Sequence, residues 1–189
     1  VIVQPERVAS YKGIVSSFRT LGSAATPQNL FTASNTTGSS VILAIRRLVI
    51  QMDATAVLTA VAPQFKVSRA TGAPTGGTAL SKVAFDSSLS SSANVSFLGA
   101  TASDGGAATA ITATAGSTGW QQFAFRLHTA VGQVLIPDES LVPVLCADDP
   151  IYLRANEHLL VQLVATVGTS NPATNHYVVQ CMFEEFTLP

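Results

Sequence analysis

Residues 41–52 read VILAIRRLVIQM, and this stretch decides the fold. It is apolar almost throughout, and the Val and Ile residues that recur in it favour β-strands. A strand with few polar positions is typical of one that is covered on both faces. A second stretch of this kind spans residues 159–166. We therefore expect these two strands to form the centre of the fold.

Three other segments alternate apolar and polar side chains, which is the period of a half-buried strand. They are residues 64–69, 120–128 and 177–184. In the clearest of them, Phe123 and Leu127 share one face, and Arg126 and His128 share the other. One face of each strand should therefore lie in the core, and the other in water or at an interface.

Clusters of Gly, Ser, Asn and Pro interrupt the chain every ten to fifteen residues or so, and helical periodicity is nearly absent. This rhythm predicts an all-β protein of short strands. The economical architecture is one domain over residues 1–189, a two-sheet antiparallel sandwich of jelly-roll type. Residues 103–119 are expected to form either a weak strand between two turns or a projecting loop.

Residues 1–30 differ in composition from the rest of the chain, because their apolar residues are isolated and they include the basic residues Arg7, Lys12 and Arg19. Their composition would not support a separate hydrophobic core. We expect a short N-terminal arm followed by a strand over residues 11–18. Such an arm can add to the sheet edge of a neighbouring molecule.

Charged residues make up 11% of the chain, against about 25% in an ordinary soluble domain. Ala, Thr and Ser supply 27, 20 and 19 residues, so small uncharged side chains must form much of the surface. A formal net charge of -1 offers almost no electrostatic repulsion against association. The composition therefore favours a protein that packs against copies of itself or against other partners.

The same composition argues against two classes of partner. The ten basic residues are scattered, and the only adjacent pair is Arg46 and Arg47, so no basic stripe is present to bind nucleic acid. The longest apolar run, residues 41–45, falls far short of the about 20 residues of a membrane-spanning helix. We therefore expect neither nucleic acid nor a membrane as a partner.

Motifs of high chemical specificity are missing from the sequence, including nucleophile elbows, zinc-protease helices and phosphate loops. The histidines His128, His158 and His176 are 30 and 18 residues apart, which matches no familiar set of metal ligands. We therefore predict no enzymatic activity, no cofactor and no metal. The simpler interpretation is that the three histidines lie at the surface or at an interface.

Four further residues have plain structural interpretations. Cys146 and Cys181 are expected to be independent thiols rather than a disulfide, because small buried cysteines are common in a chain of this size. Glu184 and Glu185 are expected to be charges at the rim of a strand rather than a pair of catalytic acids.

Arg46 and Arg47 interrupt the most apolar strand of the sequence. Neighbouring side chains of a strand point to opposite faces. One of the two arginines should therefore point towards a buried face of the sheet, unless the strand is an edge strand or contacts a partner. It would then lay its stem over the core, or form an inter-subunit ion pair or carbonyl contact. The candidate interface residues of the whole chain are Arg19, Arg46, Arg47, Trp120, Arg126 and His128.

Several segments taken together resemble small β-structured virion proteins of tailed bacteriophages. The resemblance rests on residues 10–13, 17–19, 29–34, 41–50, 67–69, 75–78, 85–88, 150–157, 159–164 and 183–185. It covers most of the chain as a pattern without chemical content, and residues 90–119, rich in Ala, Ser and Thr, depart from it.

The resemblance implies a jelly-roll-like virion subunit on the capsid exterior, the neck or the tail, without enzymatic activity. We expect a capsid decoration or accessory subunit that assembles as a homo-oligomer and contacts other virion proteins, such as the major capsid protein. Neck or tail location is one alternative. Another is a carbohydrate-binding module, which needs exposed aromatic side chains such as Trp120, Tyr152 or Tyr177.

Overall fold

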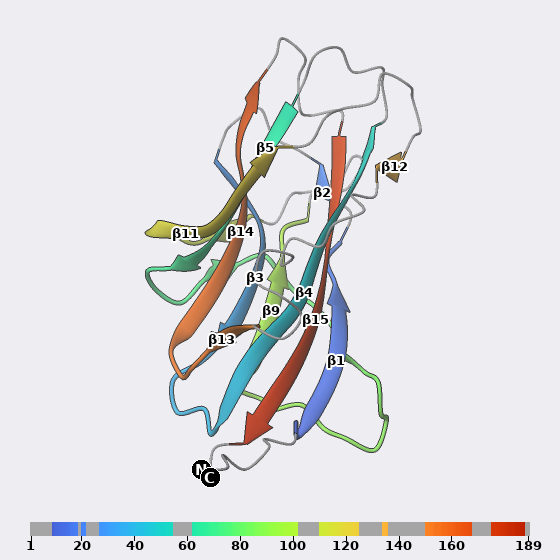
Figure 1. Cartoon of the computed structure of the whole chain (residues 1–189), viewed down its shortest axis with the longest axis vertical. Helices are drawn as coiled ribbons and strands as arrows, with labels where there is room; N and C mark the ends of the chain where they lie inside the picture. The colour runs from blue at the N-terminus through green and yellow to red at the C-terminus, as the bar shows by residue number, and fades with distance from the viewer. Residues whose placement is uncertain are drawn as a thin grey trace, which may run out of the picture.

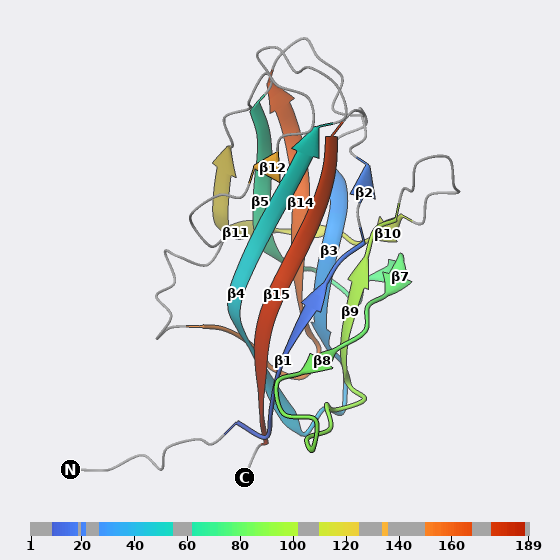
Figure 2. The ribbon, with the colours of Figure 1, turned by 90° about the vertical axis from the view of Figure 1, so that its right-hand side faces the viewer.

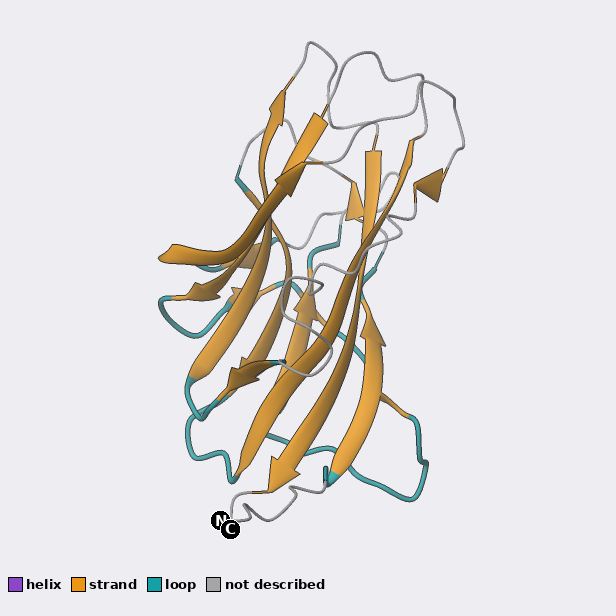
Figure 3. Ribbon diagram, in the orientation of Figure 1, coloured by secondary structure: helices purple, strands orange, loops and turns teal. Residues whose placement is uncertain are grey.

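The alternating and apolar segments form the long strands of two antiparallel sheets in the computed structural model of the chain (Figures 1 and 3). The structure describes residues 9–18, 20–21, 27–54, 62–101, 110–124, 134–135, 150–167 and 175–187. Within these ranges every regular element is a strand, as the sequence predicts. The same ranges contain no helix of the length and apolarity needed to cross a membrane.

Seven strands form the first sheet, in the order β12–β4–β15–β1–β8, with β13 paired to β4 and β2 paired to β15. They are β1 (Tyr11–Ser16), β2 (Thr20–Leu21), β4 (Val41–Ala54), β8 (Val83–Ala84), β12 (Val134–Leu135), β13 (Ile151–Leu153) and β15 (Asn175–Thr187). The predicted central stretch is β4, and it pairs with β15 along the whole length of both strands. Figure 2 looks onto this sheet, with the other sheet behind it.

Six strands form the second sheet, in the order β11–β5–β14–β3–β9–β7. They are β3 (Gln28–Asn35), β5 (Ala62–Ala70), β7 (Thr78–Ala79), β9 (Val95–Gly99), β11 (Ala115–Ala124) and β14 (Glu157–Val167). The other predicted central stretch is β14, which lies between β3 and β5. Two short strands, β6 (Thr75–Gly76) and β10 (Ile111–Thr112), pair with each other beside it.

The strand order is that of a jelly roll, because the first sheet has the order β1–β15–β4–β12 and the second has the matching order β3–β14–β5–β11. The first and last long strands, β1 and β15, pair in the first sheet. The next pair inward along the chain, β3 and β14, lies in the second sheet. Together with β4 and β5 they form the two-layered centre, so the predicted jelly-roll-like sandwich is confirmed.

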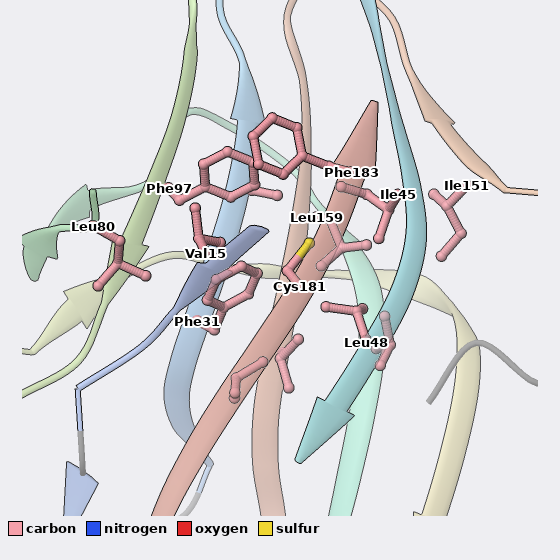
Figure 4. Close-up of a cluster of buried hydrophobic side chains, with 14 of the residues drawn as sticks. Val15, Phe31, Ile45, Leu48, Leu80, Phe97, Ile151, Leu159, Cys181 and Phe183 are labelled. Carbon is pink, nitrogen blue, oxygen red and sulfur yellow. The ribbon is translucent and has the colours of Figure 1, made fainter. Parts of the chain in front are cut away.

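The core between the sheets is built from the apolar side of the alternation (Figure 4). Its largest side chains are aromatic and fully buried, and they meet across the two layers. The Phe97 ring from the second sheet lies 4.6 Å from that of Phe183 in the first, and Phe65 meets Tyr177 edge-on at 5.4 Å. Aromatic pairs at these separations add to the stability gained from burial alone.

A β-bulge at Arg46 resolves the problem posed by the two arginines. On β15 the pairing steps from Met182 to Phe183, while on β4 it steps from Arg47 to Ile45, so Arg46 is an extra residue. The core positions of β4 therefore change parity, from Ile45 on one side of the bulge to Leu48 on the other. Neither arginine enters the core. The expectation that one of them should point towards a buried face, unless the strand is an edge or contacts a partner, assumed strict alternation, and the bulge breaks that alternation.

Two boundary predictions need adjustment. The first strand ends at Ser16 rather than at residue 18, since the Ser17 hydroxyl accepts the Val179 N–H at 2.8 Å in place of a backbone carbonyl. In the segment 103–119, residues 111–112 and 115–119 belong to β10 and β11, so this part is strand rather than loop. Residues 103–109, and residues 1–8 of the predicted arm, lie outside the described residues.

Candidate interaction surface

The outer face of the first sheet carries large apolar side chains in register with one another. Ile14 of β1 pairs with Val83 of β8 on one side and with Met182 of β15 on the other, and Met182 pairs with Arg47 of β4. Their neighbours along the strands point into the core, so these four side chains point outward. They form one row across four strands.

A second row runs parallel to it, crosses four strands and continues to Phe85 just beyond β8. We call it the cross-sheet row, and it consists of Phe85, Lys12, Glu184, Ala44 and Tyr152. Phe85 joins the row because its N–H donates to the Lys12 carbonyl at 3.0 Å, which continues the pairing of β8 with β1. An aromatic residue therefore lies at each end of the row, and two charged residues lie inside it.

The ends of these rows are accessible. Val83, Phe85 and Tyr152 are 58%, 59% and 47% exposed, which is high for apolar and aromatic side chains. Val83 and Phe85 lie at the β8 edge of the sheet, whereas Tyr152 lies at the β13 edge. Between these edges the outward residues Ile42, Ala44 and Phe186 are buried and pack with Ala9, so the accessible apolar groups form a patch at each edge of the sheet. Exposed apolar patches are candidate surfaces for interaction.

Three charged groups form a compact cluster in the middle of this face. The Glu184 carboxylate accepts a hydrogen bond from Arg46 Nε at 2.7 Å and lies 3.0 Å from Lys12 Nζ. Arg46 also stacks over the Phe186 ring, at 5.9 Å from its centroid. Burial raises the pKa of Glu184, but the hydrogen bonds from Arg46 and Lys12 outweigh it and hold the pKa below its usual value. The cluster thus keeps Glu184 ionised, and Arg46 and Lys12 balance its negative charge.

A buried carboxylate holds the β8 end of the face in place. Glu185 is 1% exposed, and it accepts hydrogen bonds from Ser91 Oγ and from the Ser92 N–H, the latter at 2.8 Å. The prediction that Glu185 is a rim charge is therefore wrong. The side chain points to the inner side of β15 because it shares the parity of the core residue Phe183.

Lys82 ties the same loop from its other end. Its ammonium group donates to the carbonyl oxygens of Ser92 and Val95 at 2.9 and 2.7 Å. Burial lowers the pKa of Lys82, while the nearby Glu185 carboxylate opposes this shift. Lys82 and Glu185 together anchor residues 82–92 on the sandwich. The backbone that carries Val83 and Phe85 is therefore held in place.

The outer face of the second sheet has a different character. Its outward positions on the central strands are mostly small or polar, and yet they are buried. Examples are Thr32, Ser34, Ser68, His158, Leu160 and Gln162. Both imidazole nitrogens of His158 lack a hydrogen-bond partner among the described residues, and burial lowers the pKa of this histidine. This face offers little accessible apolar surface from its central strands.

The candidate interface residues fall into three groups. Arg46 and Arg47 both lie on the outer face of the first sheet, and Arg47 is the exposed one. Trp120 lies in β11 of the second sheet, at a shift in the pairing with β5. Arg19, Arg126 and His128 lie outside the described residues.

The residues singled out for metal chemistry are not brought together. His158 is in the second sheet, and His176 is in the first. No group of three or more His, Cys, Asp or Glu side chains with metal-binding geometry occurs among the described residues. Cys181 is a buried free thiol whose pKa is raised by burial, and Cys146 lies outside the described residues.

One hollow of about 200 Å³ opens beside β6 and β10. Its lining consists of small neutral residues, namely Thr71, Gly72, Ala73, Thr75, Thr112, Ala113 and Thr114. It contains no acid, base or aromatic ring that would give it a specific chemistry. Tyr11 and Tyr177 are buried in the core, which leaves them unavailable for stacking on a sugar.

Comparison with protein-family models, with curated proteins and with solved structures finds no match to this chain. The functional interpretation therefore depends on the geometry of the chain itself. Sequence reasoning did not single out Val83 or Phe85, because β8 is two residues long and has no recognisable strand pattern. The Val-Ala-Phe order, apolar at alternate positions before an Asp-Ser-Ser turn, is the signal that was available.

Proposed function

We propose that this protein is a non-enzymatic structural subunit of a bacteriophage particle, most simply a decoration or accessory subunit of the capsid. In this role it assembles as a homo-oligomer and contacts neighbouring virion proteins such as the major capsid protein. The outer face of the first sheet is the surface through which it assembles.

The observation that carries the proposal is the exposure of Val83, Phe85 and Tyr152 at the two edges of one sheet face, with Phe85 and Tyr152 at the ends of the cross-sheet row. Exposing such groups to water costs free energy that contact with a partner recovers, at roughly 25 cal/mol per Å² of apolar surface. The low charge of the chain supports the same role, because it places little electrostatic repulsion between closely packed copies.

The alternative of a carbohydrate-binding module has weaker support. Sugar-binding sites use exposed aromatic rings together with hydrogen-bonding groups in a concave site. Among the tyrosines named for this role, Tyr177 is buried, and Tyr152 lies on an extended sheet face beside Ala44. We therefore favour assembly, which the exposed apolar groups at the two edges of the sheet support.

Electron microscopy of particles made without this protein tests the proposal. We expect particles that lack defined surface, neck or tail density, and we expect wild-type protein added back to restore it. A Phe85→Ser/Tyr152→Ser variant should fail to restore the density, whereas Leu89→Ser should succeed, because Leu89 is exposed but lies off the sheet face. Complete particles in the absence of the protein would contradict the proposal.

A further inference from the structure

The β8 edge of the first sheet has room for one more strand. β8 ends the strand order on this side, and no strand of the described ranges pairs with its outer edge. The Phe85 N–H donates to the Lys12 carbonyl, and the next pair along is Gly13 with Ala84. Hydrogen-bonded and non-hydrogen-bonded pairs alternate between antiparallel strands, so the N–H and C=O of Ala84 point away from β1. Such backbone groups at a sheet edge are a template for a further strand.

The side chains at this edge suit an apolar partner strand. Val83 and Phe85 flank Ala84 on the outer face, and both are more than half exposed. Lys82 and Glu185 already hold the backbone of this segment, so little order has to be gained when a partner binds. Alternate side chains of an added strand lie beside Val83 and Phe85. Apolar residues at those alternate positions would be covered together with them.

The first residues of the chain have the composition that this edge requires. Residues 1–4 read VIVQ, without a charged side chain, and Val and Ile favour strands. Val1 and Val3 share one side of such a strand. Pro5 has no N–H to donate, so it marks the end of the part that can add to a sheet. Residues 1–8 lie outside the described residues.

The position at which the described chain begins favours the β8 edge of another molecule over the chain's own. Ala9 packs against the cluster of Ile42, Ala44 and Phe186, which lies on β4 and β15. β8 lies on the other side of β1 from these strands, and Figure 2 shows the chain before β1 leading away from β8. Eight more residues in extended form span up to about 27 Å, which is enough to reach a neighbouring molecule.

We propose that residues 1–4 of one copy add as a strand to the β8 edge of a second copy. The two valines of the added strand then cover Val83 and Phe85. Backbone hydrogen bonds supply affinity in such strand addition, and the side chains supply specificity. This inference rests on the proposed function, because it names the partner that occupies part of the same surface.

Disulfide trapping tests which edge the segment occupies. The double variant Val3→Cys/Val83→Cys is made together with Cys146→Ser, so that the buried Cys181 is the only other thiol. On mild oxidation of the purified chain we expect covalent dimers or larger species. The matched control Val3→Cys/Thr37→Cys places the second thiol at an exposed turn between β3 and β4, and it should form far fewer.

Two outcomes of this trapping would overturn the proposal. A monomer that is cross-linked within itself would show that the segment occupies its own β8 edge. Cross-linking of Val3→Cys/Val83→Cys no greater than that of the control would show that the segment does not occupy this edge at all.

Serine substitutions test the same contact by affinity. Sedimentation equilibrium should show self-association of the wild-type chain, and Val3→Ser or Phe85→Ser should raise the dissociation constant about tenfold or more. The double variant should lose less than the two single effects combined, because both substitutions remove one contact. Leu89→Ser removes an exposed apolar side chain outside β8 and should leave the dissociation constant unchanged. Circular dichroism should show that all variants keep the β-sheet signature.

A wild-type chain that stays monomeric at millimolar concentration would also overturn the proposal, and would mean that a different virion protein occupies the β8 edge. Fully additive losses in the double variant would do the same, since the two residues would then act at separate contacts. The proposed function fails separately. If purified chains cross-link as described while particles are complete without the protein, the strand addition stands and the virion role is removed.

Discussion

The outer faces of the two sheets differ although both belong to one sandwich of alternating strands. On the second sheet, the outward side chains Thr32, Ser68 and Leu160 are fully buried. On the first sheet, Phe85 and Tyr152 point outward in register and stay accessible. The comparison teaches that the position of a residue on an outer face does not decide its exposure. On the first sheet the central outward residues Ile42, Ala44 and Phe186 are buried as well, so its difference from the second sheet lies in the accessible apolar groups at its two edges.

The largest expected effect contrasts one outward apolar residue from each sheet. Leu160→Ala should lower the free energy of unfolding by about 2–5 kcal/mol, because it leaves a cavity in a buried site. Val83→Ala should change it by less than about 0.5 kcal/mol, since Val83 is largely in water. Urea denaturation at a concentration where the chain is monomeric measures both, and equal losses would break the comparison.

The next effect contrasts two adjacent carboxylates on β15. Glu185→Ala should cost about 1–3 kcal/mol, because it leaves the partly buried donors of Ser91 and Ser92 without their acceptor. Glu184→Ala removes a more accessible ion pair and should cost about 1 kcal/mol or less. Hydrogen exchange should also show faster exchange of the Ser92 amide in the Glu185 variant. No change at Ser92 would show that the loop is held by other contacts.

A third contrast uses pH on the second sheet. The pKa of His158 is lowered by burial, so the unfolded chain binds a proton more readily than the folded one. Stability due to neutral His158 is therefore fully present above about pH 6.5 and is lost as pH falls from there towards the lowered pKa. Denaturation midpoints between pH 7.5 and pH 5 measure the slope. His158→Gln should flatten it, and an unchanged slope would place its origin elsewhere.

The smallest effect compares the two arginines of β4. Arg46→Ala loses the bond to Glu184 and the contact with the Phe186 ring, and should cost about 1 kcal/mol. Arg47→Ala should change the stability of the monomer by less than about 0.5 kcal/mol, because its side chain is exposed. Thermal denaturation of the dilute chain distinguishes them. A larger loss for Arg47 would contradict the assignment of Arg46 as the bonded residue.

Much of the sandwich follows from the sequence, because alternation is a local property. The apolar positions of residues 177–184 and 64–69 became the core faces of β15 and β5, and the two continuous apolar stretches became β4 and β14. The jelly-roll order was likewise expected from the number and spacing of short strands.

The interaction surface could not be derived in the same way. It depends on register between segments far apart in the chain, since Phe85, Glu184 and Tyr152 meet in one row only after four pairings form. Local patterns carry no information on such pairings. The burial of Glu185 was missed for a related reason, because its partners lie in a loop more than ninety residues earlier.

The bulge in β4 has a consequence for insertions and deletions. Arg46 has no opposite residue on β15, so a chain lacking residue 46 would restore regular pairing and keep Ile45 and Leu48 facing inward. Removing Ala44 instead would force Ile45 or its neighbours onto the wrong side of the sheet. Position 46 is therefore the point where this central strand can be shortened by one residue without turning its core residues outward.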